Sequence, residues 1–198
     1  MDRLVAVGHD VLGVVRQQAQ ADDLHRRGAS AEQADLTQVS ATEFRRVLDE
    51  ADAVVWAAGA GFGTDPATVD GQACITVQHV ADEAGVGRWV QVSSMYADRP
   101  DEGPPFLQPV LRAKNRSDEA VQRGALGWTI IRPGGLTNDP GTGRVALGRQ
   151  LVGGMVPRAD VAAVAAACVD DPTTARLAFD LVSGDTPIAD ALAALPQE

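Results

Sequence analysis

The sequence has few aromatic residues, only two cysteines and almost no lysine. Aromatic residues make up 4% of the 198 residues, and Tyr96 is the single tyrosine, so the core must consist mainly of Ala, Val, Leu and Ile. Cys74 and Cys168 lie far apart and match no metal-ligand spacing, so we interpret both as small buried residues and predict no metal site. Lys114 is the only lysine beside sixteen arginines.

Positive charge and long hydrophobic runs are also scarce. The 17 Lys and Arg residues stand against 27 Asp and Glu, which gives a formal charge of −10. This balance excludes a surface built for nucleic acid or anionic lipid, because phosphates attract Lys and Arg. No apolar run reaches the ~18 residues that a membrane helix needs, and the N-terminus lacks the layout of a signal peptide. We therefore predict a cytoplasmic protein with a small-molecule substrate and no nucleic-acid or membrane partner.

What the sequence does contain is an alternation of short apolar runs and helical stretches. With 45% hydrophobic and 22% charged residues, it has the composition of a globular protein, and its length suits one domain over 1–198. Apolar strands separated by helices predict a parallel sheet covered on both faces, which is a doubly wound, Rossmann-like α/β fold. We predict strands over 10–16, 31–36, 53–58, 88–93, 128–132, 145–147 and 178–182. We predict helices over 20–27, 42–50 (with Ser40 or Thr42 as N-cap), 69–84, 111–122, 160–169 (capped by Asp160) and 187–195.

The ends of these strands supply the candidate ligand-binding residues. In open α/β sheets, ligands bind outside the carboxyl ends of the strands, so we expect these ends to lie along one edge. The candidates are Arg16, Asp35, Ala57, Ala58, Gly59, Ser93, Ser94, Pro133 and Gly134.

Several segments carry a family resemblance over nearly the whole chain. They read GHDVLGVVR, GASAEQADLT, ADAVVWAAGAG, GVGRWVQVSSM, LRAKNRSDEAV, LGWTIIRPGGLTNDPGTGRV, PRADVAAVAA and FDLVSGDTPIADAL. In these segments the chain resembles the atypical short-chain dehydrogenase/reductases, specifically the small NAD(P)H-binding proteins related to NAD-dependent epimerases and dehydratases. The run RPGGLTNDPGTGRV is the most diagnostic.

The resemblance implies a role for each strand end. Arg16 matches the residue that pairs with the 2′-phosphate of NADP, where an acidic residue would favour the free 2′-hydroxyl of NAD. Asp35 and Leu36 match the pair that lies along the adenine. The expected cofactor is therefore NADP, with NAD as the alternative.

The remaining matches lie toward the nicotinamide. Residues 57–59 match the small residues that let the backbone approach the ribose and pyrophosphate. Ser93 and Ser94 match serines near the nicotinamide, and Pro133 and Gly134 match the turn that flanks its amide.

The N-terminus departs from the family pattern. Family members open with a strand, a glycine-rich turn of the GxxGxxG type and a helix, whereas residues 4–8 here resemble the end of that helix. The strand at the sheet centre, between the strands ending at Arg16 and Gly59, would then be missing, together with the helix N-terminus that holds the pyrophosphate. Either the natural protein starts upstream of Met1, or the neighbouring strand closes the gap and the nucleotide site is impaired. The favoured expectation is an N-terminally truncated domain.

A rival interpretation makes residues 4–8 the first strand and residues 8–13 a phosphate loop. It would place the β-branched Val11, Val14 and Val15 in loop and helix, and would leave no second strand before Gly28.

The second departure concerns the catalytic pair. These enzymes typically carry Tyr-x-x-x-Lys on the helix after the serine strand, where the ammonium assists proton transfer by the phenol. Lys114 is present, but Val110 occupies the tyrosine position. The catalytic candidates are therefore Ser94, Lys114 and Tyr96, with Lys114 also predicted to bond the nicotinamide ribose. A solvated lysine and a loop aromatic are the respective alternatives.

These residues predict an NADPH-dependent oxidoreductase of a small carbonyl, quinone or flavin-like substrate, as a monomer or homodimer. The alternatives are a non-catalytic dinucleotide-binding or redox-sensing module, which the lost tyrosine favours, and a truncated remnant with impaired cofactor binding, which the missing glycine-rich turn favours.

Overall fold

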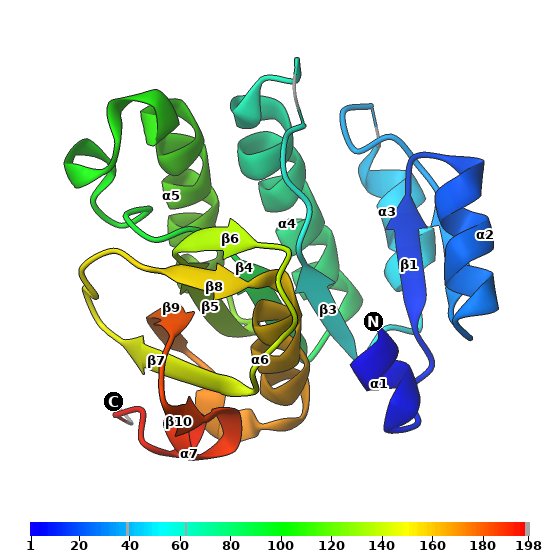
Figure 1. The fold of residues 1–198 in the computed structure, drawn as a ribbon. Coiled ribbons are helices and arrows are strands. Elements are labelled where there is room, and N and C mark those ends of the chain that lie inside the picture. The colour runs from blue at the N-terminus through cyan, green and yellow to red at the C-terminus, as the bar shows by residue number, and fades with distance from the viewer. Residues whose placement is uncertain (39, 62, 197–198) are drawn as a thin grey trace.

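The computed structural model describes residues 1–38, 40–61 and 63–196 (Figure 1). The α-helices are α1 (Asp2–Ala6), α2 (Gln18–Arg26), α3 (Ala41–Leu48), α4 (Cys74–Ala84), α5 (Gln108–Arg123), α6 (Arg158–Asp170) and α7 (Ile188–Ala193). The strands are β1 (Leu12–Val15), β2 (Ser30–Gln33), β3 (Ala53–Trp56), β4 (Arg88–Val92), β5 (Gly127–Pro133), β6 (Gly135–Thr137), β7 (Arg144–Gly148), β8 (Met155–Pro157), β9 (Leu177–Ser183) and β10 (Thr186–Pro187). A π-helix, η1 (Ala67–Ala73), and three 3₁₀ turns, η2 (Pro100–Glu102), η3 (Pro105–Leu107) and η4 (Pro172–Thr174), complete the elements.

The main sheet has the order β10-β7-β9-β5-β4-β3, and its strands β3, β4, β5 and β9 are parallel. The predicted doubly wound α/β fold is confirmed, with α6 on one face of this sheet and α4 and α5 on the other (Figure 1). The expectation that the sheet is parallel throughout is wrong at one edge, because β7 pairs antiparallel with β9. The segment from β5 to β7 contains no helix, so the chain turns back and β7 runs opposite to β5 and β9, without the crossover that a parallel strand of the same sheet requires.

Strands β1 and β2 form a separate two-stranded parallel sheet. In the described part of the chain, no strand pairs with both β1 and β3, and the two do not pair with each other. Leu12 of β1 and Val55 of β3 are accordingly exposed, at 46% and 37%. The interpretation of residues 4–8 as the end of a helix is confirmed by α1, and the rival interpretation is wrong, because 12–15 form a strand rather than a helix entry.

Two hydrophobic clusters fill the faces of the sheet. One lies under α3, α4 and α5 and includes Trp56 and Trp89, whose rings stack at a centroid distance of 6.1 Å. The other lies under α6 and α7. Cys74 and Cys168 are fully buried, one in each cluster, as predicted. Within the described residues, no helix has the length and apolarity to cross a membrane.

Local chemistry explains where several helices begin. Ser40 caps α3 through a reciprocal pair of hydrogen bonds with Glu43, so Ser40 rather than Thr42 is the N-cap. The prediction that Asp160 caps α6 is wrong, since α6 begins at Arg158. The buried Asp160 carboxylate instead accepts the backbone N–H groups of Thr142 and Gly143 and so anchors the turn before β7.

Candidate functional site

The carboxyl ends of the strands meet at one edge, as predicted. Trp56 of β3 lies opposite Gln91 of β4, which lies opposite Ile130 of β5, so the three strands end at similar heights. The end of β1 reaches the same edge, because a Cβ on Gly61 would lie 3.8 Å from the guanidinium of Arg16.

The residues predicted for the adenosine lie at the end of the small sheet. The exposed Arg16 guanidinium has no ion pair within the described residues. The Asp35 carboxylate accepts hydrogen bonds from the backbone N–H of Thr37 at 2.9 Å and its hydroxyl at 2.8 Å. These bonds, with a smaller contribution from Arg16, lower the pKa of Asp35. Leu36 packs against the core under α3. The Arg16 guanidinium is therefore available to a ligand, whereas the Asp35 carboxylate is ionised and already hydrogen-bonded within its own loop.

Small residues follow β3, where the chain must pass close to a buried carboxylate. Ala57 and Gly59 are exposed, and Ala58 packs against the core. A Cβ on Gly59 would lie 3.1 Å from Oδ1 of Asp70, which is tighter than ordinary contact. Oδ2 of Asp70 accepts the backbone N–H of Ala60 at 2.8 Å. Asp70 thus holds the turn after β3 through this hydrogen bond.

Lys114 is not a solvated surface lysine. Its Nζ lies 2.9 Å from Oδ1 of Asp70, and the two side chains are 15% and 2% exposed. Nζ also donates to the carbonyl oxygen of Val92, the last residue of β4, at 3.3 Å. The ammonium therefore lies at the carboxyl edge, held between η1 and β4.

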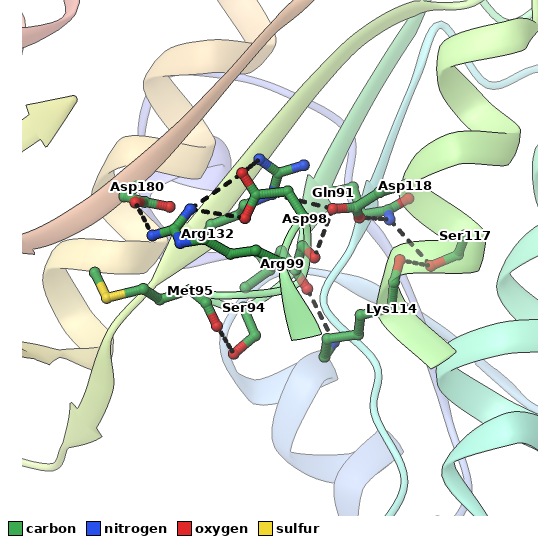
Figure 2. Close-up of polar contacts among 12 residues, drawn as sticks. Gln91, Ser94, Met95, Asp98, Arg99, Lys114, Ser117, Asp118, Arg132 and Asp180 are labelled. Carbon is green, nitrogen blue, oxygen red and sulfur yellow. Dashed lines mark hydrogen bonds and ion pairs between the residues drawn. The ribbon is translucent and has the colours of Figure 1, made fainter. Parts of the chain in front are cut away.

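Beside Lys114, a buried polar network holds the end of β4 (Figure 2). Asp118 of α5 accepts hydrogen bonds from the Ser93 hydroxyl at 3.0 Å, from Gln91 Nε2 at 2.7 Å and from Arg132 Nε at 3.1 Å. Burial raises the pKa of the Asp118 carboxyl, and the charge of Arg132 opposes that shift. The hydroxyl of Ser93 is committed to this network, so of the two serines only Ser94 remains half-exposed.

The network continues to β9 through alternating charges. Arg132 Nη1 lies 3.2 Å from Asp98, Asp98 pairs with Arg99 at 2.9 Å, and Arg99 lies 3.5 Å from Asp180. The Asp180 carboxylate also accepts the backbone N–H of Leu151 at 2.9 Å. Burial raises the pKa of Asp180, while the bond from Leu151 lowers it. The chain of ion pairs fastens the segment after β7 to the ends of β4 and β5 (Figure 2).

The two other catalytic candidates lie in the loop that leaves β4. Ser94 is half-buried, and its hydroxyl lies 3.2 Å from the carbonyl oxygen of Met95. Tyr96 adopts φ +68°, and the Arg99 guanidinium lies 4.9 Å from the centre of its ring. Val110 lies in the first turn of α5, one helical turn before Lys114. The tyrosine is therefore held by Arg99 rather than placed at the Val110 position.

Exposed apolar side chains lie near the turn at Pro133 and Gly134 in the chain. Strand β6 begins immediately after this turn and pairs with β8, with Gly135 opposite Met155. Gly134 must lack a side chain, because a Cβ there would lie 2.4 Å from the carbonyl oxygen of Gly154. Around this pair, Leu136, Met155 and Val152 are exposed at 40%, 55% and 97%.

Sequence reasoning missed the acidic partners of this site. Asp70, Asp118 and Asp180 are nearly fully buried, yet none of them was a candidate site residue in the sequence analysis. Two signals were available: Asp118 lies one helical turn after Lys114, and Asp180 interrupts the apolar run of β9. The described residues contain no cluster of three or more His, Cys, Asp or Glu side chains suited to a metal ion.

The site fits the two ends of a nicotinamide dinucleotide. Arg16 offers a guanidinium suited to a phosphate at the adenosine end, and Lys114 offers an ammonium suited to ribose hydroxyls at the other.

Comparisons with known proteins agree with this geometry. A family model described as NAD(P)H-binding matches residues 1–172. A relative from Bacillus subtilis, named an uncharacterised sugar epimerase (YhfK), is 36% identical over 187 residues, covering 93% of this chain and 87% of the relative. A solved structure from Bacillus halodurans, provisionally named an NAD-dependent epimerase/dehydratase, is 34% identical with a TM-score of 0.90, covering 98% of this chain and 92% of that one.

A third comparison links the fold to a named reductase. The structure of ChuY, an anaerobilin reductase from Escherichia coli O157:H7, is 25% identical with a TM-score of 0.78, covering 93% of this chain and 89% of that one. With the match of the family model over most of its length, the chain belongs to the NAD(P)H-binding family, in the short-chain dehydrogenase/reductase type of fold.

Proposed function

We propose that the protein is an NADPH-dependent reductase of a small conjugated acceptor, such as a carbonyl, quinone or flavin-like compound. The observation that carries this proposal is the ion-paired Lys114 at the carboxyl edge, which bonds the carbonyl of Val92, two residues before the half-buried Ser94. Exposed apolar side chains on either side of Gly154 support it. The reduced nicotinamide supplies a hydride when it is bound, so the protein need only hold both partners and exclude competing reactions.

Each candidate residue has a role in holding the cofactor or the acceptor. Lys114 donates to the hydroxyls of the nicotinamide ribose, and the Ser94 hydroxyl polarises the acceptor. Pro133 and Gly134 flank the nicotinamide amide through their backbone. Tyr96 stays a candidate for the acceptor side, where its hydroxyl would supplement Ser94.

The exposed apolar side chains after Gly134 favour a conjugated acceptor over a sugar. Leu136, Val152 and Met155 offer no hydrogen bonds to hydroxyl groups, whereas sugar sites need several polar partners. Epimerisation also starts by removing a hydroxyl proton, and Val110 cannot act as that base. These features support reduction although two similar proteins carry epimerase names.

The exposed Arg16 supports NADP rather than NAD. A guanidinium can form two parallel hydrogen bonds with the 2′-phosphate, and no acidic side chain occupies this strand end. The Asp35 carboxylate, whose pKa the charge of Arg16 helps to lower, is bonded to Thr37.

The test is NADPH oxidation with menadione or FMN as acceptor, beside an assay of UDP-glucose epimerisation. NADPH oxidation with either acceptor, and no epimerisation, is the expected result. Epimerisation without acceptor reduction would overturn the proposal. NADPH binding without turnover would support the second candidate, a dinucleotide-binding module, which the absence of tyrosine at Val110 favours.

A further inference from the structure

We propose that Asp70 is a positioning residue for Lys114, which fixes the ammonium so that one of its N–H groups faces the bound dinucleotide. The inference rests on the proposed function for the ligand, but the pair itself is a property of the ligand-free chain. Asp70 matches none of the positions that the family resemblance assigns to the cofactor.

The Lys114 ammonium has more hydrogen-bond donors than protein acceptors around it. A lysine ammonium has three N–H donors. In the described residues, one is directed to Oδ1 of Asp70 at 2.9 Å and a second to the carbonyl oxygen of Val92 at 3.3 Å. Within the same described residues the third has no protein acceptor, and the side chain keeps 15% exposure, so this donor is available to a ligand at the carboxyl edge.

Both oxygens of the Asp70 carboxylate have partners. Oδ1 of Asp70 faces Lys114, and Oδ2 accepts the N–H of Ala60. One side chain therefore sets both the ammonium and the turn after β3, whose small residues are predicted to pack under the dinucleotide. A Cβ on Gly59 would crowd this carboxylate, since it would lie 3.1 Å from Oδ1 of Asp70.

An uncommon element, a π-helix, places Asp70 beside Lys114. A regular α-helix over 69–84 was predicted, but residues Ala67–Ala73 form a π-helix before α4 begins. Such widened turns are frequent at functional sites, and they shift one side chain out of the regular helical register. Here the turn lies against α5, with Gly71 next to Ala113 and Arg116, and brings Asp70 to Lys114.

Other groups near the pair must be considered in any test that varies pH. Asp118 lies one turn further along α5, and Cys74 lies one turn after Asp70; both feel the charge of Lys114. Arg116 approaches Gly71 from α5. Of these, only Asp70 forms an ion pair with the ammonium within the described residues.

The test combines Asp70→Asn, Lys114→Met and the double variant, each measured in two ways. Without ligand, D70N should lower the urea midpoint, because it leaves the ammonium buried without its counter-charge. The double variant should recover part of that loss. For NADPH binding, D70N should weaken the affinity at least tenfold, and the double variant should bind no more weakly than K114M.

A purely structural role would not change the pH dependence of binding. In D70N, the affinity for NADPH should be lost at a lower alkaline pH than in the wild type, since an ammonium without a counter-charge gives up its proton more readily. Asp70→Glu, which keeps the charge, should restore part of the affinity. Asp160→Asn is the matched control: it removes a buried carboxylate that bonds Thr142 and Gly143 and forms no ion pair with Lys114 in the described residues, so it should lower stability and leave the pH dependence unchanged.

Two results would overturn the inference. One is additive losses of D70N and K114M, in stability and in affinity, which would show that the residues act independently. The other is a wild-type pH dependence in D70N. If the wild type fails to bind NADPH, the proposed function fails, whereas the ligand-free stability cycle still decides whether Asp70 holds Lys114.

Discussion

Replacing Arg132 with Met should destabilise the protein strongly and in a pH-dependent way. The Arg132 and Asp118 side chains are 10% and 1% exposed, and Nε lies 3.1 Å from Oδ2 of Asp118. Removing one partner of such a pair leaves an uncompensated buried charge, which costs about 3–5 kcal/mol. The carboxylate keeps its bonds to Gln91 and Ser93, so we expect about 3 kcal/mol, the lower end of this range, near neutral pH.

The pH dependence follows from Asp118. Burial already raises the pKa of Asp118, and the loss of Arg132 removes the largest opposing contribution, so the pKa rises further. A carboxyl with a higher pKa in the folded than in the unfolded state binds its proton more tightly when folded. The deficit of the variant is therefore largest above the folded pKa, and it shrinks as pH falls toward the unfolded value of about 3.9.

Urea unfolding of wild type and R132M at about pH 8 and about pH 5.5 measures both effects. The exposed pair of Arg112 and Asp101, with side chains 54% and 77% exposed, provides the control. R112M should change stability by less than about 1 kcal/mol at either pH. A loss in R132M no larger than in R112M, or a loss of equal size at both pH values, would refute the assignment of a buried charge network.

Three further predictions concern the rest of the site and the sheet. Arg16→Ala should weaken NADPH binding at least tenfold and leave NADH binding nearly unchanged in titrations, whereas equal losses would show that Arg16 does not contact the 2′-phosphate. Gly134→Ala should lower the melting temperature, because its Cβ would lie 2.4 Å from the carbonyl oxygen of Gly154; the control Gly87→Ala, with its nearest atom at 3.8 Å, should cost less, and equal melting temperatures would contradict this. Val55→Lys should reduce concentration-dependent association in size-exclusion chromatography, since it places a charge on the unpaired edge of β3, and unchanged association would exclude that edge as the contact.

Sequence patterns predicted the parts of the fold that depend on local periodicity. The apolar runs around Val90 and Ile130 are fully buried in parallel strands, and their carboxyl ends lie together as expected. The short strands β6, β8 and β10 were missed, because segments of two or three residues carry no periodic signal. The antiparallel direction of β7 was also missed, since the pattern of one strand does not encode its partner.

The sequence predicted which residues lie at the candidate site but not which side chains they contact. Lys114 was identified from its match to the family's Tyr-x-x-x-Lys pattern, but its salt bridge with Asp70 depends on a π-helix that no residue pattern indicated. Likewise, the sequence predicted Ser93 and Ser94 at one strand end, but only the structure shows that their side chains have different surroundings. Ser93 points into the network of Asp118, and Ser94 stays half-exposed. Long-range polar contacts of this kind join elements far apart in the chain, so local patterns cannot specify them.

The most direct test of the reductase proposal is the isotope dependence of NADPH oxidation. With menadione as acceptor, the wild-type protein should oxidise NADPH, and deuterium at the transferred position of nicotinamide C4 should slow the oxidation of limiting NADPH in a single turnover. Lys114→Met should reduce the rate at least tenfold in the same assay. No acceptor-dependent oxidation by the wild-type protein, or a rate that K114M leaves unchanged, would contradict a hydride-transfer site built around Lys114.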